Sequence, residues 1–427
     1  MNLILKSGAW PRALLLLAVL ATGCKKDELD NFYTETGPQF PTFQGNALNT
    51  ATKYSPGEVV TFELQFAQQT DPIKQVVIFE KLEPARDSVV VQTIPYAPAF
   101  SRIRRADTLL VRYTVPAGAN KALVRIDARL ESTNGQAKTR TFYYRLAEAT
   151  PTIVLNSGPT NVTVPAGTAP APGDIVRYNV TLNAGGITTA PVPPSTAAVP
   201  AGILYKDLDS LVVFARVGTG PERRVVRIKP AASGAQLIQN VDVPLPAGSA
   251  GQPVVLRFEA KARTPARTAS ATAAPITPAA PTPFSATVRM ATLSFTGATG
   301  GDFAAYDLTT FGTVPANGPV DSKDIAITST AGNAVQLRVL NPTAATATRL
   351  MRVTTAATFT NATLTSTRQA FNAAGAAAQV ATLDNVLVGD VIIAKLRGLD
   401  QYAVLQVASI TRTSATDVDV TFTIKAL

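Results

Sequence analysis

Residues 56–62 read Pro-Gly-Glu-Val-Val-Thr-Phe, and residues 172–178 read Pro-Gly-Asp-Ile-Val-Arg-Tyr. In each segment a Pro-Gly turn and an acidic residue precede alternating apolar and polar side chains, the period-2 pattern of a half-buried β-strand. Three more segments recur in the same order: residues 76–79 as 211–214, 115–118 as 245–248, and 124–129 as 256–261. Because apolar and charged positions keep their phase, the same positions are expected to point inward in both copies. The sequence therefore predicts two copies of one β-rich module over residues 44–270.

Each copy is expected to be an immunoglobulin-like β-sandwich. In the first copy, residues 44–149, alternation predicts strands near residues 59–66, 75–80, 88–94, 108–115, 122–131 and 138–146. The Asn-Gly dipeptide at 134–135, between the last two strands, is a strong hairpin signal. Six or seven short strands separated by turns are typical of this sandwich. The second copy, residues 150–270, carries an insertion near residues 184–203 that is rich in Gly and Pro, and we expect a surface loop there.

The rest of the chain is expected to form a linker and a third domain. Residues 262–283 are rich in Ala, Thr and Pro; they are either a last strand that runs into a semi-rigid linker or linker throughout, and we assign 271–283 to the linker. Further on, residues 388–396, 402–410 and 417–424 predict a three-strand meander. A short helix is expected to begin at Thr365 or Ser366 and end at Gly375. The predicted fold class is all-β, with two tandem immunoglobulin-like β-sandwiches and a C-terminal β-rich domain over residues 284–427.

The composition excludes several classes of function. The chain has 427 residues, no histidine and a single cysteine, Cys24. This excludes a Ser-His-Asp or Cys-His catalytic group, a zinc site with its usual ligands, and an intramolecular disulfide. No phosphate loop or dinucleotide motif is present, so we predict no enzyme, no metal site and no cofactor. Met290 and Met351 are the remaining soft ligands, and both are expected in the core. The net charge of +10 is spread thinly, so nucleic acid is not an expected partner.

The N-terminus carries a secretion signal. Lys6 and Arg12 precede an apolar run at residues 14–20 that is too short to span a bilayer. Ala-Thr-Gly at 21–23 then precedes Cys24. This segment resembles a bacterial lipoprotein signal peptide, with Ala21 where the family usually has Leu. The resemblance implies that residues 1–23 are removed, that Cys24 is acylated, and that residues 24–43 form a flexible tether.

A charged motif follows the cysteine. Lys26, Asp27 and Glu28 resemble the export signal of Bacteroidota-type surface lipoproteins, a lysine followed by two acidic residues. The alternative is a charged, solvated tether without a sorting role. The resemblance implies a protein anchored by lipid in the outer membrane and facing the cell exterior.

One loop of the first module carries the candidate binding site. Within residues 92–105, two aromatic side chains offer flat apolar faces, and three arginines offer forked donors to an acidic sugar or another anion. The site residues are Tyr96, Phe100, Arg102, Arg104 and Arg105. The second module lacks the aromatic pair, so the shared core does not account for it. The second module has a weaker basic cluster of Arg223, Arg224, Arg227 and Lys229. In the alternative interpretation, these charges belong to solvated strand ends.

Other motifs are weaker. The pairs Asp207 with Asp209 and Asp417 with Asp419 each place two carboxylates on one side of a strand, but calcium needs six or more oxygens. Residues 87–89, 107–109 and 209–211 resemble the O-glycosylation sequon of Bacteroidota-type secreted proteins, Asp followed by Ser or Thr and an apolar residue. A serine or threonine at the start of a strand explains this pattern equally well.

Two family resemblances bear on function. The C-terminal meander resembles the closing strands of haem-binding lipoproteins of the HmuY type, although the histidine pair that ligates haem in some members is absent. The general plan resembles glycan-binding lipoproteins of starch-utilisation-type systems, although the only tryptophan, Trp10, lies in the signal peptide. We therefore predict a non-catalytic protein that binds a glycan or an outer-membrane protein partner at the cell surface. The alternatives are a structural adhesin or envelope spacer, then a haem-binding lipoprotein or an enzyme.

Overall fold

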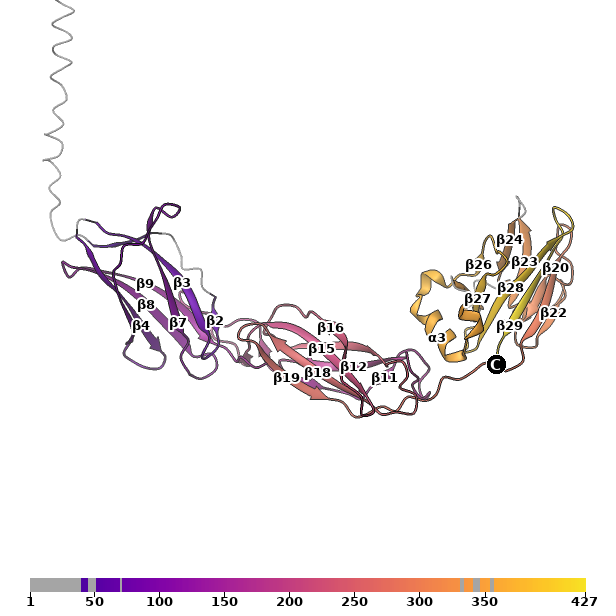
Figure 1. Cartoon of the computed structure of the whole chain (residues 1–427), viewed down its shortest axis with the longest axis horizontal. Helices are drawn as coiled ribbons and strands as arrows, with labels where there is room; N and C mark the ends of the chain where they lie inside the picture. Colours follow the sequence, from indigo (N-terminus) through magenta and orange to yellow (C-terminus); the bar gives the residue numbers. More distant parts are fainter. Residues whose placement is uncertain (1–39, 45–50, 70, 331–333, 341–345, 354–356) are drawn as a thin grey trace, which may run out of the picture. The chain divides into compact units, whose positions relative to one another are not determined.

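The computed structural model describes residues 40–427, except for 45–50, 70, 331–333, 341–345 and 354–356 (Figure 1). The predicted signal peptide, Cys24 and the export motif lie outside these residues. The chain divides into two compact units. One extends to Leu146 and includes Val192–Thr196, and the other contains Ala147–Pro191 and Ala197–Leu427. The fold is all-β, as predicted, and within the described residues no helix has the length and apolarity needed to cross a membrane.

The first unit contains a sandwich of two sheets with the strand connections of an immunoglobulin-like domain. One sheet has the order β1 (Thr42–Gln44), β3 (Val59–Ala67), β7 (Ala106–Thr114), β6 (Phe100–Ser101). The other has the order β2 (Lys53–Tyr54), β9 (Ala137–Leu146), β8 (Leu123–Ser132), β4 (Ile73–Leu82), β5 (Val89–Pro95). Inward side chains of both sheets form one buried core, as the alternating burial of β3 illustrates. All six predicted strands of this module are present.

The second sandwich repeats this plan within the second unit. Its first sheet joins β12 (Ile175–Leu182) to β10 (Ile153–Leu155), β11 (Thr160–Asn161) and β17 (Leu237–Pro244). Its second sheet has the order β16 (Arg223–Ile228), β15 (Leu208–Val217), β18 (Val254–Ala262), β19 (Arg267–Thr272). The predicted insertion lies between β12 and β15, where β13 (Gly186–Ile187) pairs in parallel with β14 (Ile203–Leu204). Leu204 and Ala190 are buried against Ala147, so the insertion has a small core of its own.

The two Pro-Gly turns are built alike. The N–H of Gly57 donates to the carbonyl of Val115, and the N–H of Gly173 donates to that of Leu245, both over 2.9 Å. The acidic residue after each glycine is buried, and its carboxylate accepts a backbone N–H from three residues earlier. The pairs are Ser55 N to Glu58 Oε2 (2.9 Å) and Ala171 N to Asp174 Oδ2 (2.8 Å). The repeat predicted from the sequence is therefore a structural repeat.

One part of the predicted repeat is shifted by two residues. The sequence match pairs residues 124–129 with 256–261, which equates Ile126 with Phe258. In the sheets, Ile78 lies opposite Ala128, whereas the equivalent Val213 lies opposite Phe258. Phe258 therefore corresponds to Ala128. A shift of two residues leaves every side chain on its original face, so the hydrophobic pattern could not detect it.

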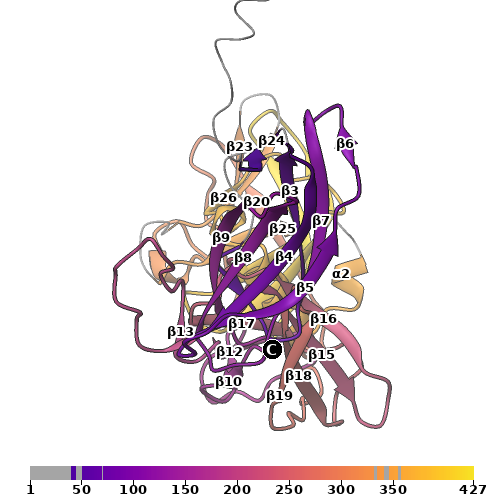
Figure 2. The same ribbon diagram turned by 90° about the vertical axis from the view of Figure 1, so that its left-hand side faces the viewer.

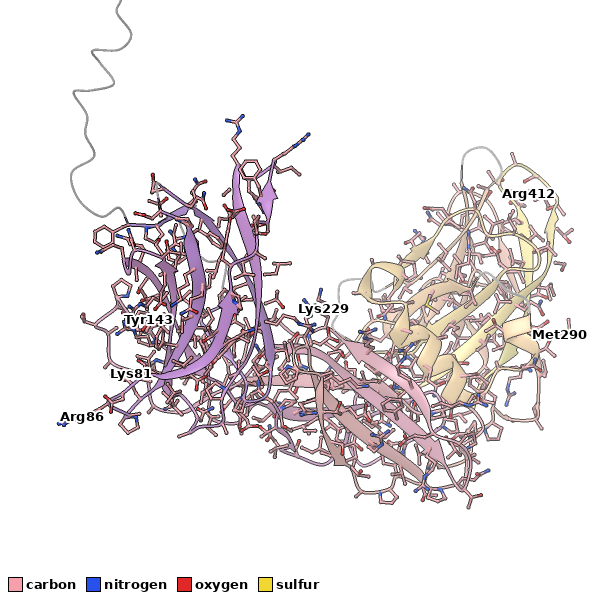
Figure 3. The ribbon with its side chains drawn as sticks, turned by 60° about the vertical axis from the view of Figure 1, so that its left-hand side comes forward. Lys81, Arg86, Tyr143, Lys229, Met290 and Arg412 are labelled. Atoms are coloured by element: carbon pink, nitrogen blue, oxygen red, sulfur yellow. The ribbon has the colours of Figure 1, made fainter. Side chains whose placement is uncertain are left out.

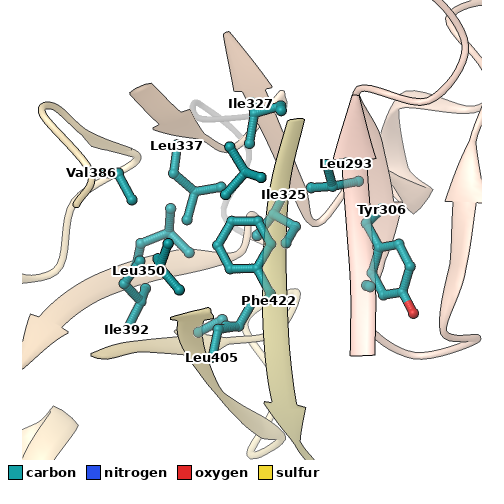
Figure 4. Close-up of a cluster of buried hydrophobic side chains, with 14 of the residues drawn as sticks. Leu293, Tyr306, Ile325, Ile327, Leu337, Leu350, Val386, Ile392, Leu405 and Phe422 are labelled. Atoms are coloured by element: carbon teal, nitrogen blue, oxygen red, sulfur yellow. The ribbon is translucent and has the colours of Figure 1, made fainter. Parts of the chain in front are cut away.

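The C-terminal domain has two five-stranded sheets. One has the order β20 (Arg289–Phe295), β29 (Val418–Lys425), β28 (Tyr402–Arg412), β27 (Val391–Lys395), β25 (Arg349–Val353). The other has the order β22 (Gly312–Val314), β21 (Ala305–Asp307), β23 (Ile325–Thr330), β24 (Ala334–Arg338), β26 (Thr382–Leu383). Side chains of both sheets surround Phe422 in a common core (Figure 4). Strands β27, β28 and β29 are the predicted meander.

Helices cover the other face of the first of these sheets. Helices α2 (Ala357–Thr360) and α3 (Leu364–Ala373) pack over β27 and β28, and η1 (Val320–Ser322) and η2 (Ala376–Ala378) are short 3-10 turns. The cap of α3 is Thr363, whose hydroxyl accepts the N–H of Ser366 over 3.0 Å. The helix begins one or two residues before the predicted start, because Thr363 caps it in place of a later residue. It ends before Gly375, whose φ of 71° stops helical propagation.

The two methionines of the C-terminal domain differ in burial. Met351 is buried under the helices, as predicted, but Met290 is 72% exposed, so its predicted core position is wrong (Figure 3). In β20 the alternate residues Ala291, Leu293 and Phe295 point inward, which turns Met290 to the outside.

The Ala-, Thr- and Pro-rich segment forms backbone hydrogen bonds with the second sandwich and with helix α3. Strand β19 occupies Arg267–Thr272, so this segment is a last strand that runs into a linker. The N–H of Ala279 then donates to Pro170 O (2.7 Å), and the N–H of Leu364 donates to Thr282 O (2.9 Å). Helix α3 also contacts the second sandwich, because Gln369 Nε2 donates to Pro172 O and to Asp174 Oδ1, both over 2.9 Å.

Candidate functional site

The predicted binding loop folds as a hairpin between β6 and β7. Ser101 pairs with Ala106, and the chain turns over residues 102–105 (Figure 2). The turn is closed from within, because Ser101 O accepts the N–H of Arg105 (2.7 Å) and Ser101 Oγ accepts that of Arg104 (3.3 Å). Ile103 at the tip is 91% exposed, and Phe100 beside it is 67% exposed. The hairpin is thus a projection whose turn carries three arginines and one exposed apolar residue, Ile103.

Tyr96 packs at the base of the hairpin. Its ring packs against Phe66 with 6.3 Å between centroids, and its hydroxyl donates to Asp107 Oδ2 over 2.9 Å. The other oxygen, Asp107 Oδ1, accepts the N–H of Ala99 (3.1 Å). Desolvation and then the neighbouring Asp107 carboxylate raise the pKa of Tyr96. Tyr96 is therefore half-buried, with its hydroxyl engaged, and offers less of an open aromatic face than predicted.

The three arginines are not equivalent. Arg104 Nε lies 3.3 Å from Glu63 Oε1, whereas Arg102 and Arg105 are exposed and form no ion pair within the described residues. Arg105 has a φ of 54°, in the left-handed region that costs a residue with a Cβ about 1 kcal/mol relative to glycine. Arg397 and Lys121 have positive φ as well, so this backbone conformation by itself does not assign a role to the Arg105 side chain.

The second sandwich uses the corresponding connection differently. Residues 229–236 connect β16 to β17, and they form hydrogen bonds with the start of the insertion. Gly234 O accepts from Asn183 Nδ2 (3.2 Å), and Gln236 Oε1 accepts the N–H of Gly185 (2.7 Å). The hairpin of the first sandwich has no counterpart there. In the basic cluster of the second sandwich, Arg223 and Arg224 are exposed, and Arg227 lies 3.6 Å from Asp209.

The C-terminal domain contains a buried ionic network that sequence reasoning missed. Arg397 Nε and Nη2 donate to the two oxygens of Asp324 (3.0 and 2.9 Å), and Nη2 also donates to Asp307 Oδ1 (2.9 Å). Burial opposes the charge of Asp307, but hydrogen bonds from Thr309, Thr310 and Arg397 lower its pKa to about 2. These residues are far apart in the sequence, so no local sequence pattern predicts that their side chains meet. Asp324 also accepts from Thr348 and Leu308, and its acceptor positions are filled from within the domain.

The network borders an open cleft, which is lined by Lys323, Asp321, Asp324 and Arg397 among others. Charges of both signs line it, and the Nζ of Lys323 donates to Ala316 O over 2.6 Å. The network fixes the ends of β21 and β23, and its balanced charges select no class of ligand.

The weaker motifs have structural explanations. Asp209 lies 3.6 Å from both Arg227 and Arg263, and Asp417 Oδ1 accepts the N–H of Gly297 over 2.7 Å. In the sequon-like segments Ser210 is buried, whereas Ser88 is exposed. Among the described residues, no group of three or more acidic or cysteine side chains could hold a metal ion.

Comparison with known proteins leaves the family open. No protein-family model and no curated protein matches the chain. A DUF4466 family protein from Parabacteroides merdae is 11% identical, with 65% of this chain and 99% of that chain covered and a TM-score of 0.23. A two-domain fibronectin type III segment of chicken tenascin is 13% identical, covering 55% and 98%, with a TM-score of 0.20. Native E. coli alpha-2-macroglobulin is 13% identical, covering 89% and 22%, with a TM-score of 0.20. These scores are too low to support an argument about function.

Proposed function

We propose that this is a non-catalytic binding protein, anchored by lipid on Cys24 in the outer membrane, that contacts an anionic partner at the cell surface through the hairpin. The observation that carries the proposal is the exposure of four hairpin side chains that do not pack into the core of the sandwich. They are Phe100, Arg102, Ile103 and Arg105. Two exposed apolar side chains next to guanidinium groups that form no ion pair among the described residues are suited to a partner with both apolar and anionic parts.

Anchoring is tested by fractionation of cells that express the Cys24→Ser variant. The variant should leave the membrane fraction, because its only thiol is lost; retention after detergent partitioning would contradict lipidation. If Lys26, Asp27 and Glu28 direct export, replacing all three by alanine should hide the protein from added protease without releasing it. Unchanged digestion of that variant on intact cells would show that the three charges form only a tether.

Binding is tested with an anionic polysaccharide, polygalacturonate, and with anionic lipid vesicles. Binding of the parent should weaken as salt rises, because exposed charges are screened over about 8 Å at physiological ionic strength. Replacing Arg102, Arg104 and Arg105 by alanine should remove most of that salt dependence. A triple variant that binds both probes as the parent does would contradict the hairpin as the binding site.

A second candidate function is that of a spacer between the membrane and a distal partner. The linker bound at Ala279 and Thr282, together with the hydrogen bonds of Gln369, favours this function for the second unit. A spacer would tolerate loss of the hairpin arginines, but its activity in adhesion would fall if the linker were lengthened.

A further inference from the structure

We infer that the hairpin end of the first sandwich docks on the anionic lipid surface in which the protein is anchored. This inference rests on the proposed lipid anchor, and it names the partner of the hairpin as a bilayer with phosphate headgroups.

The hairpin lies at the end of the sandwich where the chain enters from the predicted anchor. Thr42, the first residue of β1, pairs with Ala67 at the end of β3, and the adjacent Phe66 pairs with Asp107 at the start of β7. The sheet order is β1-β3-β7-β6, so entry and hairpin share one end of one sheet. At about 4.8 Å between strands, β1 and β6 are roughly 14 Å apart.

Exposed apolar side chains gather at this end. Phe40, two residues before β1, is 55% exposed, and it belongs to the same end of the sheet as Phe100 and Ile103 of the hairpin. Side chains of this kind enter the boundary between headgroups and acyl chains when basic residues lie beside them. Arg102 and Arg105 provide those charges, whereas Arg104 is paired with Glu63.

The chemistry favours a lipid surface over a sugar. Sugar recognition by stacking needs flat aromatic faces; Tyr96 is half-buried with its hydroxyl engaged, and Phe100 is the exposed ring on the hairpin. The outermost side chain is Ile103, an aliphatic group that has no face to stack on a ring. Apolar insertion with arginine on phosphate uses Phe100 and Ile103 as well as the two arginines that form no ion pair in the described part of the chain, Arg102 and Arg105.

A weak contact is enough here. Each arginine near an anionic membrane strengthens binding by about fivefold, so the hairpin alone would bind only loosely. A lipid anchor makes the second contact intramolecular, at an effective concentration in the millimolar range for a short tether. Because the proposed anchor already holds the protein at the bilayer, the hairpin contact only has to orient the first sandwich.

The test uses the full lipidated chain with the substitution Ile103→Trp, reconstituted in vesicles of phosphatidylcholine and phosphatidylglycerol. Trp10 lies in the predicted signal peptide, so the indole of this variant is the only one in the processed protein. Its emission should shift to the blue and be quenched by brominated lipids, and both effects should weaken in phosphatidylcholine alone or at high salt. Water-like, unquenched emission from vesicle-bound protein would overturn docking while leaving the anchor intact.

Matched variants isolate the arginines. In the Ile103→Trp background, Arg102→Ala with Arg105→Ala should lower the ratio of docked to undocked protein about 25-fold, at about fivefold each. The control Arg223→Ala with Arg224→Ala removes the same charge from the second sandwich and should change the ratio little. Equal effects of both pairs would overturn a specific role of the hairpin. Binding to polygalacturonate without insertion into vesicles would assign the hairpin to a glycan, and protein missing from the vesicles altogether would instead contradict lipidation.

Discussion

The two sandwiches share their strand connections but fill the same core position from different strands. In the first, Phe62 of β3 packs edge-to-face against Phe142 of β9, with 5.1 Å between ring centroids. In the second, the equivalent Tyr178 packs edge-to-face against Phe258 of β18 at 5.0 Å. The aromatic partner has moved to the neighbouring strand.

Small residues complete this exchange. Where the second sandwich has Phe258, the first has Ala128, as the pairing with β15 and β4 requires. Where the first has Phe142, the second has the buried Ala273, whose N–H donates to Leu256 O over 2.9 Å. Interiors are close-packed, so a large side chain on one strand demands a small one on the next. The repeat preserves the arrangement of the core and not the identity of each position.

Removing the aromatic side chain of Phe142 should have the largest effect on stability. Phe142→Ala should destabilise the first sandwich by about 3–5 kcal/mol through lost burial and a cavity. Adding Ala128→Phe imports the arrangement of the second sandwich and should recover part of that loss. Urea unfolding followed by hydrogen exchange in β3 measures both, with the exposed Thr139→Ala as control. A double variant no more stable than Phe142→Ala would show that the two cores are not interchangeable.

Buried hydroxyls provide the next comparison. In the first sandwich Tyr113 donates to Glu80 and lies 2.8 Å from the hydroxyl of Tyr144, whereas the second has Val243 and Ala215 at the positions of Tyr113 and Glu80. Tyr113→Phe should therefore cost about 1–3 kcal/mol, because Glu80 loses a buried donor.

Tyr178→Phe should have the opposite sign. The Tyr178 hydroxyl is buried without a hydrogen-bond partner in the described part of the chain, and burial raises its pKa to about 12. Removing an unsatisfied hydroxyl should leave stability unchanged or raise it by about 1 kcal/mol. Equal losses of urea midpoint in Tyr113→Phe and Tyr178→Phe would contradict this distinction.

The two turn glycines have different surroundings. Gly57 and Gly173 have φ values of 77° and 88°, so alanine at either should cost about 1 kcal/mol. A Cβ at Gly57 meets open space, but one at Gly173 would lie 2.8 Å from Gln369 Oε1. Gly173→Ala should therefore cost about 1 kcal/mol more, since displacing Gln369 breaks its bonds to the turn. In a Gln369→Ala background the difference between the two glycine variants should disappear.

The smallest expected effect is a gain. Arg105→Gly relieves a left-handed backbone and should stabilise the first sandwich by up to about 1 kcal/mol, since glycine accepts this φ at no cost. The same change should weaken docking on anionic vesicles. Thermal unfolding and the vesicle assay measure the two effects separately, and a loss of stability would show that the arginine side chain supports the fold.

Much of this architecture follows from the sequence alone. Period-2 alternation and Pro-Gly, Asn-Gly and Ala-Thr-Pro segments predict the strands of the first sandwich, the repeat and the C-terminal meander. These features are local, because a strand with one face buried must alternate and a tight turn requires particular residues. The exposed Phe100 was also accessible from the sequence, because the second copy lacks the aromatic pair of this loop.

Tertiary structure decided which side chains meet. Phe142 and Phe258 look alike as inward residues, and only the register of the sheets shows that they fill one position from two strands. Tyr96 reads as an open aromatic until Phe66 and Asp107 are placed against it. The alternation of a strand fixes which face a residue occupies, but packing against another segment fixes its neighbours, and that information is spread over residues distant in the chain.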